Sequence, residues 1–173
     1  LLGDPKRFGS WDRRGLVVGL VQSGKTSHYI GLINKAVDAG YRVIVILTGF
    51  TESLRVQTQM RAEEGFLGYY LAPARGANMR STRIGVGHIA PGKNPDSVTR
   101  RGSDFKRSIA DSFGIQVGGK EILFVIKKNV SVLTNLLNWI ENNGNAMDAS
   151  GRRFVKNVPL LVVDDESDVG SID

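Results

Sequence analysis

Short apolar runs alternate with longer amphipathic stretches along this chain. The clearest runs are LVVGL at residues 16–20, RVIVIL at 42–47, ILFVI at 122–126 and LLVV at 160–163. Continuously apolar runs of strand length are typical of strands buried on both faces of a parallel sheet. The pattern therefore predicts an α/β fold, with a parallel β-sheet sandwiched by helices. Residues 83–89 form a weaker candidate for a further strand.

The stretches between these runs have helical periodicity. Residues 26–39 carry apolar positions on one face, and Gly40 follows as a stop signal. A second helix is expected to begin after Thr51, whose hydroxyl can cap it, and to end at Gly65. A third helix is predicted over residues 130–142. With no evident linker, we expect residues 1–173 to form a single domain.

The first apolar run leads into a segment with the pattern G-x-x-x-x-G-K-[ST]. Backbone N–H groups in such a loop converge on phosphate oxygens, and the helix that follows adds its partial positive charge. The ammonium of Lys25 is expected to reach the β- and γ-phosphates, and the hydroxyl of Thr26 is a hard ligand suited to Mg²⁺. The sequence thus predicts a P-loop that binds ATP, or a similar nucleotide, with Mg²⁺. The residues expected at the nucleotide are Gly19, Gln22, Ser23, Gly24, Lys25 and Thr26.

Acidic residues follow the last apolar run, beginning with Asp164, Asp165 and Glu166. Acids at the C-terminal end of a parallel strand face the same edge of the sheet as the P-loop. The segment has the D-E-x-D form of superfamily II helicases. In that register Asp165 binds Mg²⁺ and Glu166 is the general base that polarises the attacking water. The alternative register places Asp164 at the metal.

Basic residues are concentrated in the middle of the chain. Residues 75–107 carry eight lysines and arginines against two acids, so this insertion-like segment accounts for the whole formal net charge of +6. A localised basic excess is the electrostatic footprint of a polyanion-binding protein, and a solvated loop whose charges give solubility is the alternative. The candidate contacts to nucleic acid are Thr48, Thr51, Arg100 and Arg101.

Composition excludes several classes of protein. The chain is 41% hydrophobic and 23% charged, which differs from disordered and membrane proteins. No apolar run is long enough for a membrane helix, and we expect no signal peptide because the opening residues lack an apolar stretch. The absence of cysteine rules out disulfides and thiolate metal sites. We expect a cytoplasmic protein with no membrane partner. The chain begins at Leu1 and stops shortly after the acidic motif, so we also expect further domains C-terminal to Asp173.

Three stretches together resemble the Z-one domain family, bacterial proteins often labelled as endonucleases: WDRRGLVVGLVQSGKT, AGYRVIVILTGFTESLRVQTQMR with EEGFLG, and PLLVVDDESD. The resemblance covers most of residues 3–173 and is weakest in the basic segment. It implies a RecA-like, superfamily II helicase-like ATPase core with a DNA-directed function such as restriction or defence. The nuclease label finds no support here, because ATP chemistry already explains the acidic cluster. By matching positions, the resemblance places Gln22, Gly24, Lys25 and Thr26 at the nucleotide and Asp165 and Glu166 at Mg²⁺ and water.

We therefore expect Mg²⁺-dependent ATP hydrolysis coupled to action on nucleic acid, most simply DNA. The alternative is a nucleotide-gated switch or assembly module that does not translocate. A small-molecule P-loop kinase is disfavoured, because such kinases usually lack a glutamate directly after the metal-binding aspartate. No good candidate for an arginine finger emerges from the sequence, so this chain alone is expected to hydrolyse ATP slowly.

Overall fold

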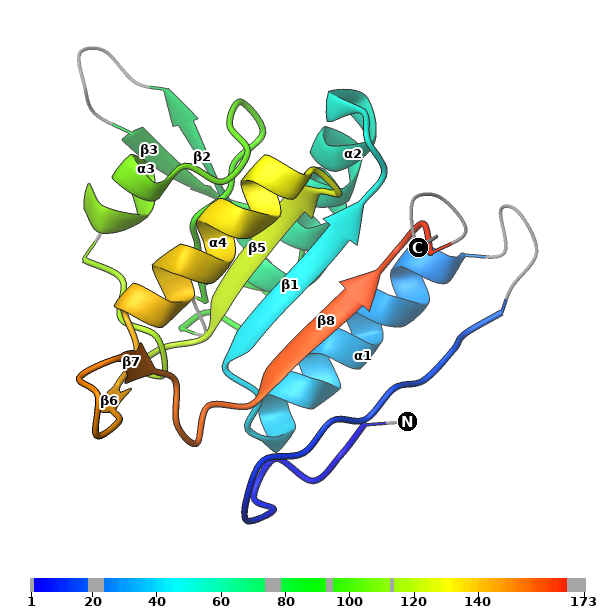
Figure 1. Ribbon diagram of the computed structural model, residues 1–173. Coiled ribbons are helices and arrows are strands. Elements are labelled where there is room, and N and C mark those ends of the chain that lie inside the picture. Colours follow the sequence, from blue (N-terminus) through cyan, green and yellow to red (C-terminus); the bar gives the residue numbers. More distant parts are fainter. Residues whose placement is uncertain (1, 19–23, 74–78, 93–94, 113, 168–173) are drawn as a thin grey trace.

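The computed structural model describes residues 2–18, 24–73, 79–92, 95–112 and 114–167. These residues form an α/β fold built on a four-stranded parallel sheet, in the order β4-β5-β1-β8 (Figure 1). Strands form at the second, third and fourth apolar runs, as predicted, but the fourth is buried on one face only, because Leu160 and Val162 are 48 and 49% exposed. The strands of this sheet are β1 (Val43–Thr48), β4 (Asp96–Ser97), β5 (Ile122–Lys127) and β8 (Leu160–Asp164).

Helices cover both faces of the sheet (Figure 1). One face is covered by α1 (Lys25–Ala39), α2 (Glu52–Ala62) and the π-helical turn η1 (Glu63–Leu67), and the other by α3 (Arg107–Ser112) and α4 (Val130–Asn142). The predictions of α1, with Gly40 at its end, and of α4 are confirmed. None of the helices in the described ranges is both long and apolar enough to cross a membrane.

Alternation along β1 divides the core in two. Ile44 and Ile46 pack with α1, α2 and η1, whereas Val43 and Val45 pack on the α4 side. Trp139 of α4 is fully buried there. Since successive side chains of a strand point to opposite faces, an uninterrupted apolar run is what a sheet covered on both sides requires.

The first predicted strand, at residues 16–20, is wrong for the part that the structure describes. Leu16, Val17 and Val18 have no strand conformation and are 74, 60 and 86% exposed. A strand forms only where a neighbour accepts its backbone hydrogen bonds, and no such bond to another described residue is found for these three. Residues 19 and 20 lie outside the described ranges.

The middle of the chain also differs from expectation. Gly65 does not end the second helix, because the chain continues through η1 to Gly68, which has a φ of 76° and closes the turn. Gly65 instead allows close packing on α1: a Cβ there would lie 2.6 Å from Cγ2 of Ile30. Residues 83–89 are not a strand, since β3 (Met79–Arg83) ends where they begin and η2 (Gly85–His88) follows.

Two antiparallel hairpins were not predicted. β2 (Tyr69–Pro73) pairs with β3, and β6 (Ala146–Met147) pairs with β7 (Arg153–Phe154). Both lie in stretches whose polar and apolar positions have no clear period. The β2–β3 hairpin contacts η1 and stands at the side of the molecule (Figure 1), so part of the basic segment projects away from the parallel sheet.

Candidate functional site

A cavity of about 320 Å³ opens at the edge of the sheet where β1 and β8 end. Its volume lies within the range of ligand-binding sites. It is built by three parts of the chain far apart in sequence: the first turn of α1, the end of β1 with α2, and the acidic segment after β8. The lining residues are Thr26, Thr48, Gly49, Leu54, Gln57, Thr58, Arg61, Asp165 and Glu166.

The described part of the predicted P-loop is its helical end. Gly24 has a φ of 75°, a left-handed conformation that favours glycine, and α1 begins at Lys25. The first N–H groups of a helix have no intrahelical acceptor and attract anions. Thr26 lies in this first turn and lines the cavity. Three residues predicted at the nucleotide, Gly19, Gln22 and Ser23, lie outside the described residues.

Asp165 lies on the same cavity and is held by α1. The hydroxyl of Tyr29 donates to Oδ2 of Asp165 at 3.0 Å, and the backbone N–H of Asp165 donates to the carbonyl of Leu47. Burial raises the pKa of the Asp165 carboxyl, while the hydrogen bond from Tyr29 and the charge of Lys25 act to lower it. The sequence did not predict a role for Tyr29 at this site. Its position one turn after Thr26 is the signal that could have found it.

Asp164 turns to a different partner. The ammonium of Lys128 lies 2.7 Å from Oδ1 of Asp164, and it also donates to the backbone carbonyl of Glu166. The Lys128 side chain is only 7% exposed, so this pair anchors the acidic segment to the end of β5. Asp164 does not line the cavity, whereas Asp165 does. This arrangement favours the register in which Asp165 serves a metal.

Glu166 lies over Gly49. A Cβ built on Gly49 would overlap Oε2 of Glu166 and would lie 3.0 Å from Cδ1 of Leu54. The carboxylate thus occupies space that a side chain at position 49 would fill. Nothing in the local sequence indicates that position 49 must lack a side chain, because the requirement comes from a residue more than a hundred positions away.

The chemistry of these residues would suit a Mg²⁺ ion that is also coordinated by phosphate oxygens. Mg²⁺ in phosphate sites usually takes one or two protein oxygens, with phosphate oxygens and waters completing its shell. The hydroxyl of Thr26 and the carboxylate of Asp165 offer such a pair on one cavity. Within the described residues there is no cluster of three histidines, cysteines or acids that could hold a metal ion by itself.

The predicted nucleic-acid contacts are placed differently from one another. Thr48 is 1% exposed, and its hydroxyl donates to the carbonyl of Ile126. This hydrogen bond links the end of β1 to the neighbouring strand β5. Thr51 is exposed and caps α2 by accepting from the N–H of Leu54, as its capping role predicts. A buried Thr48 hydroxyl with an internal partner is not presented to a polymer on the surface.

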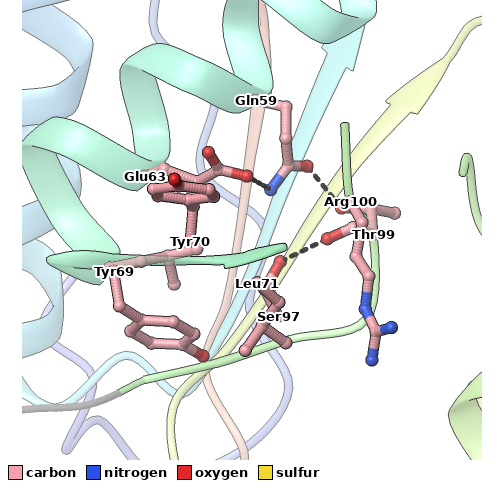
Figure 2. A pocket seen from close by; sticks show the side chains of 9 residues that line it. Gln59, Glu63, Tyr69, Tyr70, Leu71, Ser97, Thr99 and Arg100 are labelled. Carbon is pink, nitrogen blue, oxygen red and sulfur yellow. Dashed lines mark hydrogen bonds between the residues drawn. The ribbon is translucent and has the colours of Figure 1, made fainter. Parts of the chain in front are cut away.

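Half-buried Arg101 pairs with a buried polar cluster formed by Gln59, Glu63 and Thr99. Figure 2 shows Gln59 between Glu63 and Thr99: its amide donates to Glu63, and it accepts from the Thr99 hydroxyl at 2.9 Å. Nε of Arg101 donates to Glu63 at 2.6 Å, and its guanidinium lies 4.4 Å from the ring centre of Tyr70. The cavity between these groups measures about 10 Å³, which is room for about one water.

Arg55 of α2 clamps the same part of the basic segment. Its fully buried guanidinium donates to the backbone carbonyls of Arg100 and Arg101 and to the carboxylate of Glu52. The Arg100 side chain is half-buried beside the small cavity, and burial lowers its pKa. Residues 100 and 101 are therefore integral to the fold. The exposed cations of the described basic segment are Arg80, Arg83, Lys106 and Arg107.

Comparison of the chain with models of protein families, with curated proteins and with solved structures finds no significant match. The case for a function therefore depends on the residues and geometry of the cavity.

The placement of Glu166 over Gly49 generates a prediction about stability. Gly49→Ala is expected to destabilise the protein by about 1–3 kcal/mol, because the added methyl overlaps the carboxylate and nearby Leu54. In a Glu166→Ala background the same substitution should cost at least about 1 kcal/mol less. Denaturant unfolding of the four proteins in this double-mutant cycle measures the difference.

Gly31→Ala is the matched control, since a Cβ at this exposed position of α1 meets nothing within 4 Å. It should stabilise the helix by about 0.5–1 kcal/mol. If Gly49→Ala lowered the free energy of unfolding equally with and without the Glu166 carboxylate, the Glu166 side chain would not lie over Gly49.

Proposed function

We propose that this chain is a P-loop nucleotide-binding domain that binds ATP with Mg²⁺ in the 320 Å³ cavity and hydrolyses it. One observation carries the proposal. Thr26, from the glycine-lysine-threonine segment, lines the same cavity as Asp165 and Glu166, from the acidic segment after β8. The sequence pattern of each segment separately predicts that it binds the nucleotide. In the fold, residues of both segments line one cavity.

The residues divide the work as follows. Lys25 and the N-terminus of α1 bind the phosphates, and Thr26 and Asp165 would hold Mg²⁺. When bound, the ion neutralises charge that develops on the transferred phosphoryl group. Glu166 orients a water and accepts its proton while the water oxygen bonds to the γ-phosphorus and the bond to the β-γ bridging oxygen breaks. Products are ADP and inorganic phosphate.

Residues around this set keep it in place. Tyr29 orients Asp165 by its hydrogen bond, and Lys128 fixes the adjacent Asp164 and the Glu166 backbone. Holding both ends of the acidic segment limits the motion of the groups that must meet a metal and a water. Preorganised groups of this kind contribute to rate because they need no rearrangement during the reaction.

We further propose that hydrolysis is coupled to action on DNA, in a RecA-like, helicase-type domain. Support comes from the resemblance to the Z-one domain family and from the exposed cations on β3 and at α3, which give a polyanion a place to bind. A nucleotide-gated switch without translocation stays the alternative. Stimulation of ATP hydrolysis by duplex DNA in the full-length protein distinguishes the two.

Lys25→Ala is expected to weaken ATP binding at least tenfold, because a charge-assisted phosphate contact contributes about 1.5–3 kcal/mol. The fold should be retained, since Lys25 is exposed. Lys35→Ala, an exposed lysine further along α1, is the control and should leave the affinity unchanged. A calorimetric titration with Mg²⁺ and ATP measures both. Equal ATP affinities of wild type and Lys25→Ala would show that Lys25 does not bind the phosphates, and would contradict the proposed nucleotide site.

Substitutions in the acidic segment separate metal binding from proton transfer. Glu166→Gln should abolish hydrolysis but keep Mg²⁺·ATP bound, because the amide keeps the shape and cannot accept the proton. Asp165→Asn should weaken the Mg²⁺ dependence of binding, whereas Asp164→Asn should mainly loosen the pair with Lys128. Nucleotide titrations at several Mg²⁺ concentrations test this. A metal phenotype for Asp164→Asn and none for Asp165→Asn would place the metal one residue earlier.

Salt dependence tests the DNA proposal. Replacing exposed Arg80 and Arg83 with alanine should lower DNA affinity and reduce the log–log salt slope by about 0.7–0.9 for each phosphate that the protein no longer neutralises. Arg153→Ala, an exposed arginine outside the basic segment, is the control. Arg101 is a poor choice for this test, because its replacement breaks the pair with buried Glu63. Parallel slopes for all variants would leave these arginines as solubilising charges.

A further inference from the structure

α2 lines the cavity with one face. It supplies Leu54, Gln57, Thr58 and Arg61, four of the nine lining residues. Positions separated by three, four or seven residues lie on the same side of a helix, which is how a single helix can present all four. The helix follows directly from β1 through Gly49 and its capping residue Thr51. The wall that it forms is thus fixed to the sheet edge where Asp165 and Glu166 lie.

The two arginines on α2 have opposite surroundings. Arg55 is fully buried and its guanidinium is engaged by Glu52 and by two backbone carbonyls. The Arg61 side chain is 70% exposed, and its ion pair with Glu64 is long, at 3.7 Å. Exposed ion pairs of this kind contribute little to stability. The Arg61 guanidinium can therefore leave Glu64 and bind another anion at a small cost in free energy.

Arg61 is also the one cation among the described residues that line the cavity, beside the two carboxylates of Asp165 and Glu166. A bound nucleoside triphosphate carries more negative charge than Mg²⁺ and Lys25 neutralise next to these carboxylates. A further cation on the wall is therefore favoured electrostatically. Guanidinium suits this task, because its planar fork donates two parallel hydrogen bonds to phosphate oxygens.

We propose that Arg61 contacts the terminal phosphate of the bound nucleotide and makes the site selective for the triphosphate. This inference rests on the proposed function and deepens it. Arg61 would then be an arginine finger within this chain, which no sequence motif indicates. The residue is a catalytic one in this scheme, because it touches the phosphoryl group that is transferred.

The test compares ATP with ADP. Arg61→Ala should weaken Mg²⁺·ATP binding about tenfold to a hundredfold and change ADP binding less than about twofold, since ADP lacks the phosphate that Arg61 contacts. Arg61→Lys should recover part of the affinity, as a point charge replaces the fork. Arg153→Ala removes the same charge from β7, at the other end of the sheet (Figure 1), and should change neither affinity.

Thermal unfolding of Arg61→Ala is expected to match that of wild type, because the side chain is largely exposed. Equal decreases in affinity for ATP and ADP, or no decrease for either, would overturn the role of Arg61 while leaving nucleotide binding intact. Failure of the wild-type protein to bind either nucleotide, or binding that Lys25→Ala does not weaken, would instead overturn the proposed function and this inference with it.

Discussion

The central position of β1 in the sheet is the constraint on which the rest depends. β1 pairs in parallel with β5 on one side and with β8 on the other. This register places Thr48 beside Lys127, and Leu47 beside Asp164. Parallel strands end at a common edge, so every polar group that follows a strand is delivered to the same side of the molecule. The cavity is a consequence of this pairing.

A second consequence concerns the buried charges. β1 lies between β5 and β8, so the side chain of Lys128, which follows β5, reaches past the end of β1 to Asp164 of β8, and the two charges neutralise each other there. Burying a charge without a partner is strongly unfavourable, whereas a hydrogen-bonded pair is tolerated. Asp164 is thus paired with Lys128 and does not line the cavity. Asp165 does line the cavity, and among the described contacts Tyr29 is the only hydroxyl that donates to its carboxylate.

α2 joins the cavity to the basic segment. One side of the helix presents Thr58 and Arg61 to the cavity, while Arg55 and Gln59 hold the backbone and side chains of residues 99–101. The cavity and residues 99–101 of the basic segment thus contact different sides of the same helix.

The sequence by itself determined the three apolar runs that form β1, β5 and β8 and the bounds of α1 and α4, because periodicity and capping are encoded locally. It also located both segments of the candidate site. The tertiary structure decided what depends on distant residues: that Leu16 to Val18 lack a strand partner among the described residues, that Gly49 yields space to Glu166, and that Arg101 serves Glu63 inside the protein. Local patterns cannot specify such pairings, since each requires two parts of the chain to meet.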